Sequence, residues 1–246
     1  MMFLTGMHHP HQAWRVPAAF ISAHALRRRK SGFPVRRWVL DSGAFRTIEL
    51  HGGYPEPVTE YAALIRRYAG NGRLLAAVSQ DYMCEAFMLA KTGLTVEDHQ
   101  RLTIERYDAL LACDVGGVRI MPVLQGYAPA DYARHVLAYG RRLAHRAWVG
   151  VGSVCKRNGR PGAIEAVLLA IKAVRPDLRL HGFGVKLTAL SSQLVRHLLF
   201  SADSMAWSFA ARMEGRGGND PADAVRYGRR IATMPVQLHL LHEEMI

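Results

Sequence analysis

Cysteine is scarce in this sequence. Its 246 residues include three cysteines, Cys84, Cys113 and Cys155, an odd number at wide spacing. They form neither a disulfide framework nor a CxxC metal or redox motif. We therefore expect a protein of the reducing cytoplasm.

Long apolar runs are also absent. No segment approaches the roughly eighteen apolar residues that a membrane-spanning helix needs. The first fifteen residues, MMFLTGMHHPHQAWR, lack the basic region, apolar run and cleavage site of a signal peptide. The sequence predicts neither a membrane protein nor a secreted one.

Acidic residues are outnumbered: 20 Asp and Glu stand against 32 Lys and Arg, a net charge of +12. Half of the residues are apolar and 21% are charged, which excludes disordered, collagen-like and fibrous chains. A surplus of positive charge favours a polyphosphate partner, and nucleic acid is the commonest one.

Apolar runs alternate with amphipathic segments along the chain, a pattern typical of β/α units around a parallel sheet. The predicted strands are Met2–Thr5, Ala19–Ser22, Trp38–Asp41, Leu74–Ser79, Arg119–Leu124, Trp148–Gly152, Leu178–Gly184 and Ala202–Trp207. The predicted helices are Pro57–Ala69, Val96–Ala112, Pro129–Arg146, Pro161–Val174, Ala189–Leu199 and Pro221–Thr233. Eight units in one chain of this length favour a (β/α)8 TIM barrel, with residues 1–246 as a single domain. An open doubly wound sheet is the alternative.

Polar residues stand where these strands end. Asp41 and Asp81 follow two apolar runs, Gln125 follows a third, and Asp203 lies in the last run with Met205 and Trp207 in phase with it. In a barrel, such strand ends converge on one face, where active sites are built.

Each acid also has a structural interpretation. Asp41 before Ser-Gly and Asp81 at a strand end could cap a turn or a helix. Asp203 is harder to explain in that way, because a buried acid must be paired, protonated or functional.

Five motifs at successive strand ends resemble those of the tRNA-guanine transglycosylases, over roughly residues 38–216. They are Asp41-Ser42-Gly43-Ala44-Phe45, similar to Asp-Ser-Gly-Gly-aromatic; Pro122-Val-Leu-Gln125-Gly126, similar to Val-Gln-Gly; two glycine turns, Gly150-Val-Gly152 and Gly182-Phe-Gly184-Val-Lys186; and Asp203, followed by Arg212, where the family keeps its nucleophile.

One feature of the tRNA-specific enzymes is missing. Their zinc motif, Cys-x-Cys-x-x-Cys with a distant His, has no counterpart after Cys155. The sequence therefore resembles more closely the phage and bacterial branch that inserts 7-deazaguanine bases such as preQ0 into DNA. This resemblance implies a TIM barrel without the zinc subdomain and a pentosyltransferase without metal or redox cofactor. If a phage encodes the chain, we expect it in the host cytoplasm.

The resemblance also implies roles in base exchange. Asp203 would attack C1′ and Asp41 would act as general acid and base. Asp81 would accept hydrogen bonds from the N1 and N2 edge of guanine. Gln125, with backbone N–H groups near Gly150 and Gly152, would bind O6 and the 7-position, while Phe45 and His181 would stack on the base. The expected substrate-binding residues are Ser42, Phe45, Asp81, Gln125, Gly126, Gly150, Gly152, His181, Gly182 and Lys186.

Basic residues in the predicted loops are candidates for phosphate contacts, because the target base must be flipped out or presented single-stranded. These candidates are Arg27, Arg28, Arg29, Lys30, Lys156, Arg157, Arg160, Arg212 and Arg216. The structural interpretation is a solvated basic face.

Histidines near the two ends have simpler interpretations. His8, His9 and His11 lack nearby acids or cysteines and surround Pro10, so no metal site is predicted there. His239 and His242 lie among leucines and are expected to pack in the core or at an interface.

The partners expected are DNA and a 7-deazaguanine co-substrate, with no membrane and no particular oligomeric state. Three alternatives remain at this point: the same reaction on tRNA, a nucleic-acid-binding barrel without catalysis, and a barrel enzyme acting on a small phosphorylated metabolite.

Overall fold

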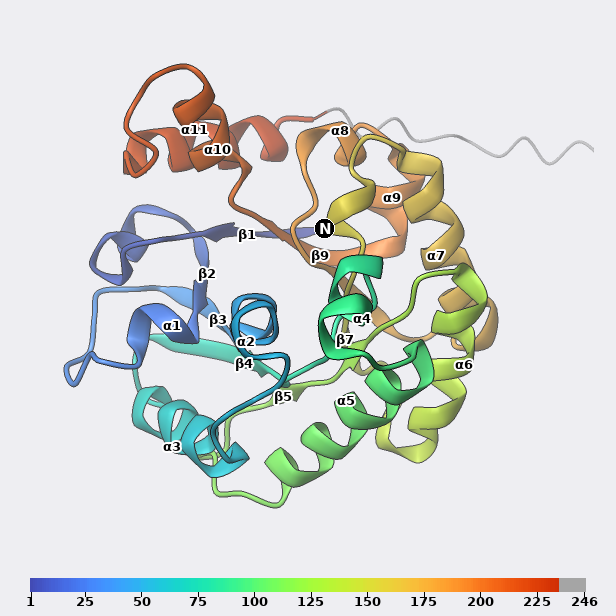
Figure 1. Cartoon of the computed structure of the whole chain (residues 1–246). Coiled ribbons are helices and arrows are strands. Elements are labelled where there is room, and N and C mark those ends of the chain that lie inside the picture. The colour runs from blue at the N-terminus through green and yellow to red at the C-terminus, as the bar shows by residue number, and fades with distance from the viewer. Residues whose placement is uncertain (235–246) are drawn as a thin grey trace, which may run out of the picture.

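A computed structural model describes residues 1–234, in which nine parallel strands form one nearly closed barrel surrounded by helices (Figure 1). The strand order is β5-β4-β3-β2-β1-β9-β8-β7-β6. The strands are β1 (Met2–Gly6), β2 (Ala18–Ser22), β3 (Arg37–Asp41), β4 (Arg73–Val78), β5 (Ile120–Met121), β6 (Val123–Leu124), β7 (Trp148–Val151), β8 (Arg179–Gly182) and β9 (Leu199–Ser204). The predicted TIM-like barrel is confirmed, and the open sheet is excluded.

The ninth strand arises from a proline. Only Pro122 separates β5 from β6, and proline has no N–H to donate to a neighbouring strand. β5 pairs with β4 and β6 pairs with β7, while the Pro122 carbonyl accepts a 2.8 Å hydrogen bond from the Gly150 amide. The single strand predicted over Arg119–Leu124 is therefore divided at the point where the barrel closes.

Helices fill the connections between the strands. They are α1 (Ala23–Leu26), α2 (Ala44–His51), α3 (Val58–Tyr68), α4 (Ala86–Thr92), α5 (Val96–Leu111), α6 (Pro129–Tyr139), α7 (Pro161–Val174), α8 (Leu187–Leu190), α9 (Gln193–Leu198), α10 (Ala206–Met213) and α11 (Pro221–Ala232), with 3-10 turns η1 (Pro10–Arg15), η2 (Gly140–Arg142) and η3 (Cys155–Arg157). The short helices α2, α4 and α10, which follow β3, β4 and β9, were not among the predicted helices.

The last strand corrects a prediction. β9 covers Leu199–Ser204 instead of Ala202–Trp207, so the helix predicted to reach Leu199 ends earlier. Trp207 lies in α10, and its indole N–H donates to the Gly6 carbonyl at 2.9 Å. Met205 and Trp207 are thus not in phase with Asp203 on a strand, although Asp203 remains buried near the end of β9.

Apolar side chains fill the inside of the barrel. Leu4, Phe20, Val39, Val78 and Met121 belong to an inner cluster built from the strands, whereas a larger cluster joins the strands to the surrounding helices. Side chains alternate along a strand, so residues two positions beyond the inner ones also face inward. The inner cluster thus forms the floor beneath the strand ends.

Within residues 1–234, no helix combines the length and apolarity needed to cross a membrane. His239 and His242, for which packing was expected, lie outside the described residues.

Candidate active site

Three carboxylates lie at the carboxyl end of the barrel. Asp41 ends β3, Asp81 follows β4 and Asp203 lies near the end of β9. They influence one another: burial, and then the charge of Asp203, raises the pKa of Asp41 from 3.8 to about 7. The charge of Asp41 in turn contributes to the raised pKa of Asp81. The structure therefore brings the three predicted acids into one site.

Asp41 is held by the turn that follows it. The Ser22 hydroxyl and the amides of Ser42 and Gly43 donate hydrogen bonds to Asp41, which moderates the rise in its pKa. Gly43 has φ +74°, and a Cβ there would lie 2.5 Å from the His24 ring. Glycine is therefore required at position 43 of this turn, because a larger residue there would be both strained and obstructed.

Asp81 and Gln125 form a direct pair in the buried part of the site. The side-chain amide of Gln125 donates to Asp81 Oδ2, and the Ser153 hydroxyl donates to Gln125 Oε1 at 2.9 Å. Burial is the main cause that raises the pKa of Asp81 to about 7. A Cβ on Gly152 would lie only 2.1 Å from Gln125 Nε2. Glycine is therefore needed at this position, directly after β7, to leave room for the Gln125 side chain.

The glycine amides of β7 are already engaged. Gly150 N–H donates to the Pro122 carbonyl at 2.8 Å, and Gly152 N–H donates to the Leu124 carbonyl at 2.9 Å. These two amides complete the sheet, so the prediction that backbone N–H groups near Gly150 and Gly152 bind the base applies to other amides of this segment. The absence of a side chain at Gly150 makes room for the Phe183 ring, 2.4 Å from where its Cβ would stand.

Asp203 receives contacts from the glycine turn after β8. The Gly184 amide donates to Asp203 Oδ1 at 3.0 Å, and His181 Nε2 lies 3.3 Å from the same oxygen. Asp203 is only 6% exposed. A backbone donor thus fixes one oxygen of the carboxylate, a contact that the sequence motif did not indicate.

His181 is fully buried under this carboxylate. Its ring stacks on Phe20 with centroids 5.5 Å apart. Its Nδ1 lies 3.0 Å from Ser201 Oγ, which accepts a 2.7 Å hydrogen bond from the Trp148 indole N–H. If the Ser201 hydroxyl donates to Nδ1, the ring proton is on Nε2, the nitrogen on the side of Asp203; Nε2 itself has no hydrogen-bond partner at this geometry. His181 thus lies beside the candidate nucleophile in the barrel interior and is not exposed to solvent.

Buried polar atoms without a hydrogen-bond partner are concentrated here. Among the described residues they are Ser42 Oγ, Ser79 Oγ, Glu85 Oε2 and His181 Nε2. All four belong to strand β8 or to segments that follow β3 and β4. Buried polar groups are normally paired, so the strand ends offer hydrogen-bonding positions for a ligand. Glu85, whose pKa burial raises, was not predicted from the sequence.

The remaining predicted substrate-binding residues have varied surroundings. Ser42 is buried, whereas Phe45 is 38% exposed at the start of α2. Gly126 and Gly182 permit close packing, because added Cβ atoms would lie 2.7 Å from Asp131 and Val185, respectively. The ammonium of Lys186 lies over the Phe209 ring, 5.4 Å from its centroid.

Asn158 links two of the loops at the site and was not predicted. Its side-chain amide donates to the carbonyls of Cys155 and Gly184, the latter at 3.0 Å, and its oxygen accepts from the Lys186 amide at 2.6 Å. It thereby ties the segment after β7 to the turn that holds Asp203. Its position in a basic loop gave no local signal for this role.

Several of the predicted phosphate-binding residues are already engaged. Arg27 pairs with Glu56 at 2.9 Å, and Arg216 pairs with Glu214 and Asp223. Arg29 donates to two nearby carbonyls and lies against the end of α3, where the Tyr68 hydroxyl donates to the Arg29 carbonyl.

The other predicted phosphate-binding residues have no acidic partner among residues 1–234. These are Arg28, Lys30, Lys156, Arg157, Arg160 and Arg212.

The N-terminal histidines make different contacts. His8 Nε2 lies 2.9 Å from Ser208 Oγ, whereas the rings of His9 and His11 contact each other at 5.6 Å. In the described part of the chain, no three His, Cys, Asp or Glu residues gather in a way that could hold a metal.

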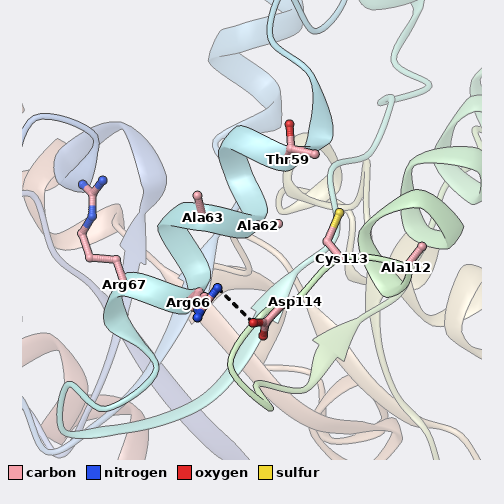
Figure 2. A pocket seen from close by; sticks show the side chains of 8 residues that line it. All are labelled: Thr59, Ala62, Ala63, Arg66, Arg67, Ala112, Cys113 and Asp114. Atoms are coloured by element: carbon pink, nitrogen blue, oxygen red, sulfur yellow. Dashed lines mark ion pairs between the residues drawn. The ribbon is translucent and has the colours of Figure 1, made fainter.

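Two surface hollows lie apart from the three carboxylates of the site. One, of about 690 Å³, lies between α3 and the end of α5 and contains the 3.0 Å ion pair of Arg66 and Asp114 (Figure 2). The other, of about 1800 Å³, includes the first residues of several strands, at the opposite end of the barrel. Neither is lined by Asp41, Asp81 or Asp203.

Comparison with known families gives a match over most of the chain. The sequence model of the DpdA family, described as DeoxyPurine in DNA protein A, matches residues 2–223. No curated protein matches the chain.

Proposed function

We propose that this chain, which belongs to the DpdA family of DNA-guanine transglycosylases related to the tRNA-guanine transglycosylases, exchanges guanine in DNA for preQ0 or a related 7-deazaguanine. The family points to insertion of deazapurines into DNA, a glycosyltransferase-type reaction. One observation supports exchange of guanine for a 7-deazaguanine at this site. Three carboxylates, whose charges affect one another's pKa values, lie at the same strand ends as buried polar atoms without a hydrogen-bond partner.

Asp203 is the proposed nucleophile. One of its carboxylate oxygens attacks C1′ of the deoxyribose while the bond from C1′ to the base breaks, giving a covalent glycosyl-enzyme. Gly184 N–H holds Oδ1 at 3.0 Å, which limits rotation of the carboxylate and leaves Oδ2 for the attack. Attack by the incoming base on the same carbon then releases Asp203 and restores the original configuration.

Asp41 is the proposed proton carrier. Its pKa of about 7 allows both protonation states near neutral pH. In the first step it gives a proton to the departing guanine, and in the second it takes a proton from the incoming deazaguanine. Because Asp41 begins and ends the cycle protonated, the two half-reactions balance without another acid or base.

Asp81 and Gln125 are the proposed readers of the base. In the absence of a base they satisfy each other through a hydrogen bond. A bound guanine would insert its N1–H and N2 amino edge against Asp81 and its O6 toward the Gln125 amide. Ser153 donates to Gln125 Oε1 and so orients the Gln125 side-chain N–H groups toward Asp81 and the base.

An SDS-stable adduct between protein and DNA tests this mechanism. The wild-type protein, incubated with guanine-containing DNA and no deazaguanine, should form the adduct, and Asp203→Asn should not. Asp114→Asn, an exposed acid beside Arg66, is the matched control and should behave as the wild type. Exchange of labelled guanine by Asp203→Asn at the wild-type rate would refute the assignment. A parallel reaction with tRNA at the same salt concentration distinguishes the two polymers, and we expect product with DNA only.

A further inference from the structure

We propose that four exposed aromatic side chains at the mouth of the barrel hold unpaired nucleotides beside the target guanine, so that the substrate is single-stranded or locally opened DNA. We call Phe45, Phe87, Tyr127 and Phe209 the rim aromatics. This inference rests on the proposed function, because it concerns the DNA that the same site would receive.

The rim aromatics are unusually accessible for residues of their size. Phe45 is 38% exposed, Phe87 44%, Tyr127 56% and Phe209 54%. Aromatic side chains normally contribute to the core because burying them is favourable. Here apolar rings face solvent on segments that follow the carboxyl ends of strands.

Each rim aromatic follows one of the candidate catalytic or base-binding residues. Phe45 comes four residues after Asp41 (45 − 41), and Tyr127 comes two residues after Gln125 (127 − 125). Phe87 comes six residues after Asp81 (87 − 81), and Phe209 comes six after Asp203 (209 − 203). The same strand ends therefore carry a polar residue followed by an exposed aromatic one, so all four rings lie on segments at the end of the barrel that holds the polar site.

A positive charge lies over every one of these rings. The Lys156 ammonium is 5.3 Å from the Phe45 centroid and 5.5 Å from that of Phe87, and the two rings contact each other at 5.8 Å. The Arg157 guanidinium is 5.0 Å from the Tyr127 centroid. The Lys186 ammonium is 5.4 Å from that of Phe209.

These three cations form no close ion pair in the described chain, although the charges of Lys156 and Arg157 act on the buried Glu85 carboxyl. None of Lys156, Arg157 and Lys186 forms an ion pair among residues 1–234. Cation–π contacts at exposed sites are weak, so a phosphate can draw the two lysine ammonium groups away from their rings. The Arg157 guanidinium also donates hydrogen bonds to the carbonyls of Tyr127 and Ser153, which hold it beside the Tyr127 ring. The rim then offers two surfaces in adjacent positions: a ring face for a base and a cation for its phosphate.

This chemistry distinguishes between forms of DNA. Base pairs in a duplex are stacked on each other and present no free faces, whereas unpaired bases stack readily on aromatic side chains beside a basic path. A rim that recognised only duplex backbone would need the cations alone. The exposed rings therefore favour a strand whose bases are already separated, which also lowers the cost of moving the target guanine into the pocket.

The opposite end of the barrel provides a matched control. Phe200 is 39% exposed, and the Arg179 guanidinium lies 5.2 Å from its ring centroid. Phe200 is the second residue of β9 and does not follow a strand, so it shares the chemistry of the rim aromatics without their location.

The test measures binding in an Asp203→Asn background, where no covalent step interferes. Oligonucleotides carry one guanine with 2-aminopurine on either side, as single strands and as duplexes. We expect tighter binding of the single strand and quenching of 2-aminopurine by stacking. Phe87→Leu, Tyr127→Leu and Phe209→Leu should each weaken single-strand binding by about 5- to 100-fold, as loss of one stacked base implies. Phe200→Leu should leave binding unchanged.

Equal affinity for single strand and perfect duplex would overturn the inference, as would rim variants that bind like Phe200→Leu. Thermal unfolding of each variant verifies that the fold is retained. The outcome is independent of the covalent mechanism: if Asp203→Asn retains base exchange, the proposed nucleophile is wrong, while the binding comparison still decides the role of the rim.

Discussion

His181 Nε2 lies 3.3 Å from Oδ1 of Asp203, and both residues are buried at the carboxyl end of the barrel. The other ring nitrogen is held by Ser201, which accepts from the Trp148 indole. These contacts place Nε2 beside the carboxylate, without a hydrogen bond between the two groups in this structure. We therefore propose that His181 positions the proposed nucleophile, whereas the family resemblance implies that it stacks on the base.

Replacement of His181 should therefore affect the reaction more than DNA binding. We expect His181→Phe to lower the rate of adduct formation at least ~10-fold, a loss of about 1.4 kcal/mol in transition-state stabilisation. KM for DNA should change little, and His181→Gln, which retains an N–H donor, should recover part of the rate. A purely structural role would instead predict equal losses in both variants, in proportion to their loss of thermal stability.

The raised pKa values of Asp41 and Asp81 predict a dependence of stability on pH. Each pKa rises from 3.8 to about 7 on folding, mainly through burial. An acid with a raised pKa contributes stability that is complete below pH 3.8 and is lost as the pH rises through about 7. The difference in Tm between Asp41→Asn and the wild type should therefore increase, in favour of the variant, as the pH rises from 5 to 8. Each kcal/mol of unfolding free energy that the wild type loses corresponds to about 2–4 °C. A difference in Tm that stays constant from pH 5 to pH 8 would contradict the raised pKa of Asp41.

Gly152 should not tolerate a side chain. Alanine there would place its Cβ 2.1 Å from Gln125 Nε2, which would displace the amide from Asp81. We expect Gly152→Ala to cost about 1–3 kcal/mol in stability and to weaken binding of the free base. Gly159→Ala, where no atom lies within 4 Å of the new Cβ, is the control. Calorimetric titration with guanine and thermal unfolding would detect both effects, and wild-type base affinity in Gly152→Ala would refute the close contact.

Asn158 should matter for both stability and rate. Asn158→Ala removes the side chain that joins Cys155, Gly184 and Lys186, and leaves backbone groups without a partner. We expect a loss of about 1–3 kcal/mol and slower adduct formation, because the Gly184 amide that holds Asp203 becomes less fixed. Denaturant unfolding and single-turnover kinetics measure the two effects. A variant that loses stability but keeps the wild-type rate would show that the hydrogen bonds of Asn158 do not affect the position of Asp203.

Local patterns were sufficient for the barrel and for the three acids. Each of the eight predicted strand ranges contains a strand in the structure. The prediction succeeded because a buried parallel strand requires a short apolar run, which can be recognised without knowledge of the neighbouring strands. The helix predicted at Pro161–Val174 matches α7, since a proline at its start and a regular apolar stripe mark it clearly. Helices α2, α4 and α10 have eight residues or fewer and were missed, because so few turns give little periodicity.

Acids and an amide that end successive parallel strands can be recognised from the order of residues alone, and parallel strands place such ends on one face. What each of these groups contacts depends on the folded chain. It engaged the Gly150 and Gly152 amides in the sheet, buried His181 beneath Asp203 and paired Arg216 with Asp223. The physical reason is that apolar periodicity depends on residues close in the chain, whereas a hydrogen bond or ion pair depends on strand register and on loops distant in sequence.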